Sequence, residues 1–386
     1  MNATHKGIVT LLRSAITGER LPLPADFALG NALELTGKHH MAPLIYEGAA
    51  ACGIALNTPA MGKLFRAYCR AVQVSDGQME QIGRIFAAFE EAGIDYLPLK
   101  GCNMKRRYPK PELRTMGDAD ILIRMEQYDK IRPILEALGF AFKLESDHEL
   151  IWQSEKLFLE LHKHLIPSYN TDYYAYFGRG WDFARRSGGY RCDMEAEDEF
   201  IYLFGHFAKH FRDGGIGCRH VADLWVFLRE NPGLDMERVA AALEKLQLSA
   251  FFGHIRGLIR YWFEDGAGNE RLEMISEFIF ESGSWGRMES KILSWNIRTA
   301  EKDGGGRLGH LRQVLFPGAG ALKERYPVLQ RAPWLLPAVW VWRPIYKLLF
   351  DRRAVKKQEK ALKTLSKENL QARRKFLGAV GLEFRC

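Results

Sequence analysis

The sequence predicts an α+β protein in which a small α/β core lies between helical regions. Residues 1–93 show the apolar spacing of helices, residues 94–175 alternate strand-like with helix-like segments, and helical spacing returns after the core. We therefore expect four parts: a helical N-terminal region over 1–93, the core over 94–175, a helical domain over 176–315, and a Trp-rich segment with a basic C-terminal tail over 316–386.

The elements of the core follow from local patterns. The helix that contains Met79 to Phe89 is expected to end at Gly93, since glycine is the usual residue at a helix C-cap. The strand over 94–100 carries Pro98, which favours a sheet edge or a strand end. Beyond a polar loop, the pattern predicts an amphipathic helix over 125–138 and strands over 118–123, 140–144, 148–152 and 157–162.

The chain after the core has mostly helical patterning. Helices are expected over 195–211, 221–229, 236–246 and 251–263. Residues 333–350 are apolar and rich in Trp, but they contain three prolines, Arg343 and Lys347. Because a membrane-spanning helix needs about 20 mostly apolar residues in a row, we expect no transmembrane segment.

Positive charge is concentrated at the C-terminal end. The whole chain carries +8, and residues 321–386 contain 16 Lys and Arg against 5 Asp and Glu, which leaves −3 for the first 320 residues. This uneven charge argues against a protein that binds nucleic acid along its whole surface. Two interpretations of the tail stay open. It either makes peripheral contact with an anionic surface or forms a basic helix that faces solvent.

The cysteine pattern and the N-terminal sequence bear on the cellular compartment in which the protein is expected. The six cysteines are scattered without a Cys-x-x-Cys pair, which suits a reducing environment better than a disulfide framework or a zinc knuckle. The first residues lack the apolar core and cleavage site of a secretory signal. We expect a cytoplasmic protein.

The strongest chemical signal is the pair Asp118 and Asp120. Alternate residues of a strand share a face, so both carboxylates point one way while Ala119 and Ile121 point into a core. Two carboxylates on one face are costly unless a cation offsets them, and Mg²⁺ or Mn²⁺ with substrate phosphates is the economical explanation. The alternative is a pair of surface aspartates on an edge strand.

A third carboxylate follows on a later strand. The alternation in residues 157–162 places Glu160 and His162 on one face and the leucines on the other. If this strand lies beside the Asp118–Asp120 strand, Glu160 completes a site for two metal ions of the phosphoryl-transfer type. An exposed edge-strand residue is the other interpretation of Glu160.

A cationic loop precedes the aspartates. Lys100 and Gly101 lie where a strand ends and a helix is expected to begin, so the backbone can approach a phosphate and Lys100 can add a charge. Arg114 belongs to the same basic loop, which suits a polyphosphate that approaches Mg²⁺. A solvated charged turn would look similar.

These motifs together resemble an uncharacterised bacterial nucleotidyltransferase family of the DNA polymerase β-like superfamily. The matching positions are Leu99-Lys100-Gly101, Tyr108-Pro109, Arg114, Asp118-Ala119-Asp120, and Glu160 with His162. The resemblance implies a small mixed-sheet nucleotidyltransferase domain and an NTP substrate. It further implies metal binding by Asp118, Asp120 and Glu160.

A pair of histidines follows in the next helical region. His206 and His210 lie one turn apart on a predicted helix and therefore share a face. Zinc would need a third ligand that the sequence does not indicate. We expect the pair to line the nucleotide site together with His162, while packing against the core is the alternative.

The sequence thus leads to two hypotheses on function. In the first, the protein is an enzyme that transfers NMP from an NTP to a hydroxyl-bearing acceptor (a small molecule, peptide, protein or RNA) by a two-metal mechanism and releases pyrophosphate. In it, Lys100, Gly101 and Arg114 hold the outer phosphates. In the second, it is a non-catalytic nucleotide-binding or adaptor protein whose basic tail binds a membrane surface or RNA. The three carboxylates favour the enzyme.

Overall fold

The computed structural model describes residues 1–303, 315–318, 322, 326, 328–350 and 363–384. The chain forms two compact units. The first unit consists of Met1–His210 with Ile216–Trp285, and the second consists of Phe211–Gly215 with Gly286–Cys386. Every candidate site residue belongs to the first unit.

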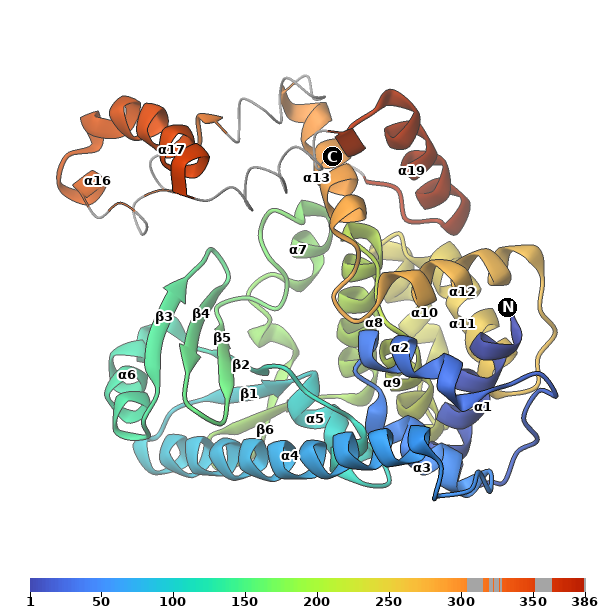
Figure 1. The fold of residues 1–386 in the computed structure, drawn as a ribbon. Coiled ribbons are helices and arrows are strands. Elements are labelled where there is room, and N and C mark those ends of the chain that lie inside the picture. The colour runs from blue at the N-terminus through green and yellow to red at the C-terminus, as the bar shows by residue number, and fades with distance from the viewer. Residues whose placement is uncertain (304–314, 319–321, 323–325, 327, 351–362, 385–386) are drawn as a thin grey trace. The chain divides into compact units, whose positions relative to one another are not determined.

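A seven-stranded mixed sheet is the centre of the first unit (Figure 1). Its strands, in the order in which they lie side by side, are β3 (Ala141–Glu145), β4 (Glu149–Gln153), β5 (Phe158–His162), β2 (Ala119–Ile123), β1 (Tyr96–Leu99), β7 (Arg191–Met194) and β6 (Ala184–Gly188). Strand β2 pairs antiparallel with β1 and parallel with β5. The predicted α+β class with a mixed sheet is confirmed.

The position of β1 corrects one expectation. This strand lies between β2 and β7, so the interpretation of Pro98 as a mark of a sheet edge is wrong. The alternative, a strand end, agrees with the structure, because β7 pairs with β1 at Tyr96 and Pro98 lies near the other end of the strand. A proline is tolerated there because no ladder hydrogen bond to β7 depends on its missing N–H.

Strands β6 and β7 lie where the sequence patterns predict only helices. The pattern in β6 is Ala-Arg-Arg-Ser-Gly, which has no apolar alternation, and four of its five residues are exposed. Such a strand at the edge of a sheet leaves no hydrophobic signal, and its Arg185 and Arg186 are the kind of charged residues that protect sheet edges.

One face of the sheet is covered by helices α4 (Pro59–Ala92) and α6 (Tyr128–Ala137) (Figure 1). The core beneath them contains buried side chains from both helices and from the strands, including Ile85, Phe89, Ile131, Ile121 and Leu159. Helix α4 ends as predicted, because Gly93 adopts a φ of 67° and its N–H bonds to the carbonyl of Glu90.

The first unit also contains further helices. They are α1 (Ala3–Thr17), α2 (Leu29–Lys38), α3 (Ala42–Ala51), α5 (Gly101–Met104), α7 (Thr171–Phe177), α8 (Ala196–Asp213), α9 (Cys218–Glu230), α10 (Met236–Lys245), α11 (Ser249–Phe263) and α12 (Glu270–Ser282). Short 3₁₀ turns occur at Lys105–Arg107, Pro111–Leu113, Met125–Gln127 and Trp181–Phe183. Helices α8 to α11 correspond to the four helices predicted after the core.

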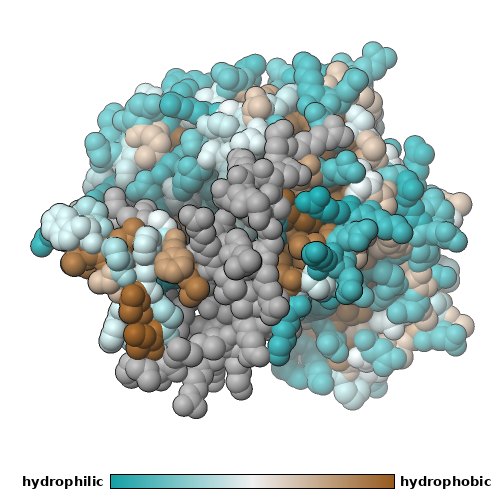
Figure 2. All heavy atoms as spheres, turned by 90° about the horizontal axis from the view of Figure 1, so that it is seen from above, coloured by the Kyte–Doolittle hydropathy of each residue, from teal (hydrophilic) through white to brown (hydrophobic). Residues whose placement is uncertain are grey.

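The second unit contains α13 (Met288–Asp303), α16 (Val328–Arg331), a 3₁₀ turn at Pro333–Leu335, α17 (Leu336–Phe350) and α19 (Lys367–Val380). Figure 2 shows hydrophobic side chains on the α17 segment at the left of that view, and Val341 and Trp342 are more than half exposed. Among the helices that the structure describes, none combines the length and hydrophobicity that crossing a membrane requires.

The basic tail is partly integrated into the second unit. In α19, Leu377 and Val380 are buried, and the guanidinium of Arg373 donates to the carbonyls of Phe211 and Arg212. The final helix is therefore packed on one side, where Arg373 is buried, while its other charged residues are exposed. The expected basic helix from Arg352 to Phe376 lies partly outside the described residues, which omit 351–362.

Candidate functional site

The acidic residues gather on the sheet face opposite α4 and α6. Strands β2 and β5 are parallel neighbours, with Asp120 directly opposite Glu160. Because side chains alternate along a strand, burying Ala119 and Ile121 under α4 and α6 turns Asp120 to the other face. The same alternation in β5 turns Glu160 and His162 to that face, as the sequence predicts.

Asp120 is the centre of this arrangement and is 3% exposed. Its Oδ1 lies 2.8 Å from Lys100 Nζ and 2.8 Å from His162 Nε2. Burial by itself raises the pKa of this carboxyl group, but the charge of Lys100 and the hydrogen bond from His162 lower it below its ordinary value. Asp120 is therefore held as a carboxylate in a buried position.

The pKa values of the two other carboxyl groups, by contrast, lie above their ordinary values. Burial and the charge of Asp120 raise the pKa of Asp118, which lies directly before β2. Burial likewise raises the pKa of Glu160, and the charges of Asp120 and Asp118 add to the effect, although Glu160 Oε2 lies 3.6 Å from His162 Nε2. Mutual repulsion links all three, as expected where carboxylates converge without a divalent cation.

Lys100 provides the positive charge within the cluster. Its ammonium group is attracted by Asp120 and Glu160, and these charges overcome burial and raise its pKa above the ordinary value. Its backbone adopts a φ of 41°, an uncommon conformation for a residue other than glycine. Strained backbone of this kind costs about 1–3 kcal/mol and clusters at functional sites.

Gly101 and Arg114 pack against each other beside this cluster. A Cβ atom on Gly101 would lie 2.8 Å from Arg114 Nη1 and 2.8 Å from Met116 Sδ, so no larger residue fits without displacement. The Arg114 guanidinium donates to Asp223 at 3.0 and 3.3 Å, and the Tyr108 hydroxyl donates to the same carboxylate at 2.8 Å. Arg114 is thus 6% exposed and already bound to a carboxylate.

Helix α8 contributes His206 and His210, whose Nε2 atoms lie 2.9 Å apart. Burial lowers the pKa of His206 far below its ordinary value, and the charge of Lys100 adds to the effect. His206 is therefore close enough to the acidic cluster for the charge of Lys100 to act on it.

Tyr202 is a further member of the site that the sequence patterns do not indicate. Burial raises the pKa of its hydroxyl group, which also interacts electrostatically with Lys100, Asp120 and Glu160. It precedes His206 by four residues and so lies on the same face of α8. This spacing is the available signal, but an aromatic residue on a buried helix face usually indicates core packing.

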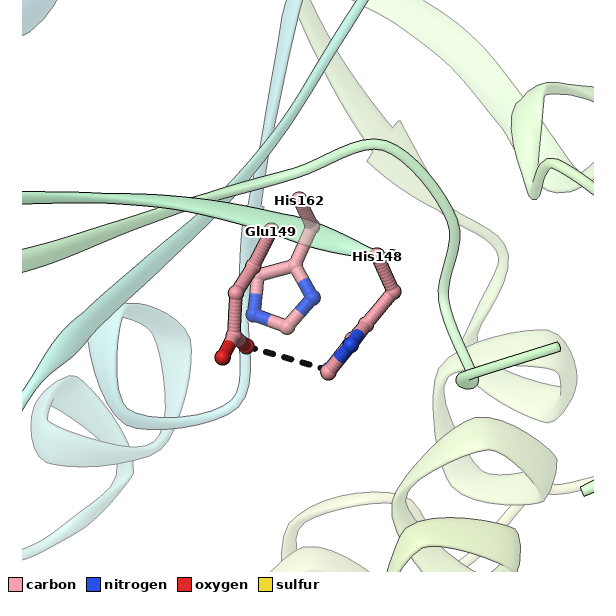
Figure 3. Close-up of side chains that lie close together, drawn as sticks. All are labelled: His148, Glu149 and His162. Atoms are coloured by element: carbon pink, nitrogen blue, oxygen red, sulfur yellow. Dashed lines mark ion pairs between the residues drawn. The ribbon is translucent and has the colours of Figure 1, made fainter. Parts of the chain in front are cut away.

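Among the residues that the structure describes, two groups of side chains could hold a metal ion. In the first, ligand atoms of Asp120, Glu160 and His162 lie within 4.8 Å of one another. The second consists of His148, Glu149 and His162 (Figure 3). His148 and Glu149 are absent from the sequence-based candidates because their proximity to His162 depends on the register between β4 and β5.

Known proteins resemble this chain to different degrees. The solution structure of the antibiotic-resistance factor ANT(2'')-Ia matches with a TM-score of 0.33 and 15% sequence identity, over 49% of this chain and 96% of that chain. Curated proteins give no significant match. A family model described as "Uncharacterised nucleotidyltransferase" matches residues 26–264, which span the sheet, both candidate metal groups and α8. The chain therefore belongs to this nucleotidyltransferase family.

Proposed function

We propose that the protein transfers an NMP group from an NTP to a hydroxyl-bearing acceptor, with pyrophosphate as the leaving group. The acceptor oxygen forms a new bond to the α-phosphorus while the bond to the β-phosphate oxygen breaks, and the acceptor proton passes to a base or to solvent. The observation that carries this proposal is the gathering of Asp118, Asp120 and Glu160 on one sheet face in a chain of this family.

The three carboxylates are proposed to hold divalent cations, Mg²⁺ or Mn²⁺. Their electrostatics suit such ions, since the pKa values of Asp118 and Glu160 are raised by neighbouring negative charge that a cation would relieve. Bound ions of this class neutralise the charge that develops on the transferred phosphoryl group. His162 orients the Asp120 carboxylate through its hydrogen bond, and the role proposed for Glu160 is to complete the site and ease deprotonation of the acceptor hydroxyl.

The outer phosphates are assigned to Lys100, Gly101 and Arg114. This role requires Lys100 to exchange its contact with Asp120 for a phosphate once cations neutralise that carboxylate. The same role for Arg114 requires its guanidinium to exchange Asp223 for a phosphate. His206 and His210 would line the site from α8. The charge of Lys100 already contributes to the lowered pKa of His206.

The test is transfer of label from α-³²P-labelled ATP, GTP, CTP and UTP to components of a cytoplasmic extract, with Mg²⁺ or Mn²⁺ present. We expect one labelled product that is absent with Asp120→Asn. The control is Glu145→Gln, which alters an exposed carboxylate in β3 that pairs with Lys163. A product that persists with Asp120→Asn, or no product from any of the four nucleotides, would reject the proposal.

A further inference from the structure

The second group of metal-competent side chains lies at the end of β5, beside the acidic cluster. Ligand atoms of His148, Glu149 and His162 lie within 4.8 Å of one another, and His148 Nε2 is 3.0 Å from Glu149 Oε2. Figure 3 shows the Glu149 carboxylate joined to the His148 ring by this contact, with the His162 ring beside both. Two imidazoles and one carboxylate thus converge on a small volume.

The fold of the β4–β5 hairpin brings these residues together. Glu149 and His162 are direct partners in the antiparallel pairing of the two strands, so their side chains share a face. His148 directly precedes β4, and its backbone is held to β5 because the N–H of Lys163 donates to the His148 carbonyl at 2.7 Å. A residue outside the strand is free of strand alternation, and His148 can therefore lie on the same face as Glu149.

The environment of His162 points independently to a ligand. The residue is 2% exposed, and its Nε2 faces Asp120 at 2.8 Å. Its Nδ1 is buried and has no hydrogen-bond partner within the described part of the chain. A buried polar atom without a partner destabilises the fold, and most buried polar atoms in proteins have a hydrogen-bond partner or a ligand.

A metal ion provides that explanation through the tautomer of His162. In the neutral ring, a hydrogen bond donated by Nε2–H to the Asp120 carboxylate leaves a lone pair on Nδ1 that a metal ion can bind. Histidines that bind metals usually donate their other ring N–H to a carboxylate in this way, because the hydrogen bond fixes the ring and increases its basicity. The pair Asp120–His162 has this arrangement.

We propose that His148, Glu149 and His162 form a second metal site, which takes a divalent transition ion of the Zn²⁺ class. Imidazole ligands suit such ions, whereas Mg²⁺ prefers oxygen ligands. Two histidines and one glutamate also leave a fourth tetrahedral position for water or another donor atom. This site shares no proposed ligand with the Asp118–Asp120–Glu160 group, to which His162 joins it through its contact with Asp120, and its existence does not depend on the proposed nucleotidyl transfer.

The experiment uses the full chain after removal of metals with a chelator. The background is Cys69→Ser, because Cys69 is the exposed thiol among the described cysteines and cysteine sulfur is a competing ligand for Zn²⁺. Titration with Co²⁺ is followed by its visible absorption, and Zn²⁺ binding by calorimetry, both without nucleotide. We expect one tight ion per chain, which excess Mg²⁺ does not displace.

The variants His148→Ala and Glu149→Gln are expected to weaken Zn²⁺ binding by about tenfold or more. The matched controls are His254→Ala and Glu145→Gln, which lie outside the group and should bind as the parent does. Circular dichroism and the melting temperature of the metal-free variants establish that they fold. Unchanged Zn²⁺ affinity in folded His148→Ala and Glu149→Gln would overturn the proposal.

A further variant separates this site from the acidic cluster. Asp118→Asn is expected to retain Zn²⁺ binding and to lose Mn²⁺-dependent NTP binding, since Asp118 belongs to the acidic cluster alone. If Asp118→Asn loses Zn²⁺ while His148→Ala keeps it, the transition ion binds at the acidic cluster and the second site is rejected. If Zn²⁺ binding behaves as expected while no nucleotidyl transfer occurs, the proposed function fails and the second site stands.

Discussion

The ammonium group of Lys100 lies 2.8 Å from the carboxylate of Asp120, within a cluster that contains two further carboxylates. This contact joins the end of β1 to the middle of β2, and it involves a lysine whose backbone has a φ of 41°. Lys100 therefore supplies, from the chain itself, part of the positive charge that divalent cations are proposed to supply during catalysis.

The first prediction follows from this contact. Lys100→Met should lower the free energy of unfolding of the metal-free protein by about 3–5 kcal/mol, because it leaves Asp120 buried without its charged partner. Mn²⁺ should restore part of this loss through binding to the folded state. Urea denaturation with and without Mn²⁺ measures both effects. Lys156→Met, which breaks an exposed ion pair with Glu80, is the control and should change little.

The second prediction contrasts the two aspartates. Asp118→Asn should raise the melting temperature of the metal-free protein, because the ionised Asp118 is opposed by burial and by the charge of Asp120. Asp120→Asn should lower it, because both Lys100 and His162 lose their carboxylate partner. Thermal unfolding checks the two directions, and both variants should lose Mg²⁺-dependent stabilisation by NTP. Melting temperatures that move in the same direction would contradict the described electrostatics.

The sheet face on which Asp120 and Glu160 lie could be predicted because it depends on local alternation. The period of two in residues 118–123 and 157–162 is enough to put Asp120 and Glu160 on the face opposite the apolar residues. Helix ends were similarly predictable, as Gly93 shows. These features need only the sequence within one element.

Contacts that depend on register or on distant segments could not be predicted. Asp223 follows Arg114 by 109 positions, and nothing near either residue indicates that they are partners. His148 and Glu149 meet His162 only through the pairing of β4 with β5. Strand β6 could not be predicted because an exposed edge strand requires no apolar pattern.

The third prediction concerns Arg114 and Asp223. Arg114→Ala should reduce the free energy of unfolding by about 3–5 kcal/mol, since it leaves a buried carboxylate uncompensated. The double variant Arg114→Ala with Asp223→Ala should be less destabilised than the sum of the single variants. Calorimetry with NTP and NMP on Arg114→Lys then tests phosphate binding. A larger loss for NTP than for NMP supports it, and equal losses assign Arg114 to the fold alone.

The fourth prediction is a pH dependence that originates at His39. This histidine is buried, its Nε2 lies 3.0 Å from the carbonyl of Phe280, and its Nδ1 accepts the N–H of Cys218 at 3.2 Å. The Nδ1 contact requires the neutral ring. Burial lowers the pKa of His39 from 6.5 to about 4, and the carbonyl of Phe280 offsets only part of this effect.

The sign of the effect follows from proton binding. Between pH 6.5 and pH 4 the unfolded chain binds a proton at His39 that the folded protein does not bind, so stability falls as the pH falls through this window. The full loss is about 3 kcal/mol. His39→Gln should make the free energy of unfolding less dependent on pH across the window, as measured by urea denaturation. An equally steep dependence in the variant would exclude His39 as its source.

The last prediction concerns the C-terminal tail. Truncation after residue 350 removes α19, whose Leu377 and Val380 are buried and whose Arg373 donates to the carbonyls of Phe211 and Arg212. We expect the truncated protein to lose a cooperative unfolding step and to become more sensitive to proteolysis within residues 286–350. Binding of Mn²⁺ and NTP should persist, because Lys100, Asp120 and Glu160 all belong to the first unit.

The control is the double variant Arg374→Gln with Lys375→Gln, which removes two exposed charges and keeps the helix. If these two substitutions reproduce the effect of truncation, the charge of the tail matters to the fold; if they leave unfolding and proteolysis unchanged, the buried face of α19 is what the second unit requires.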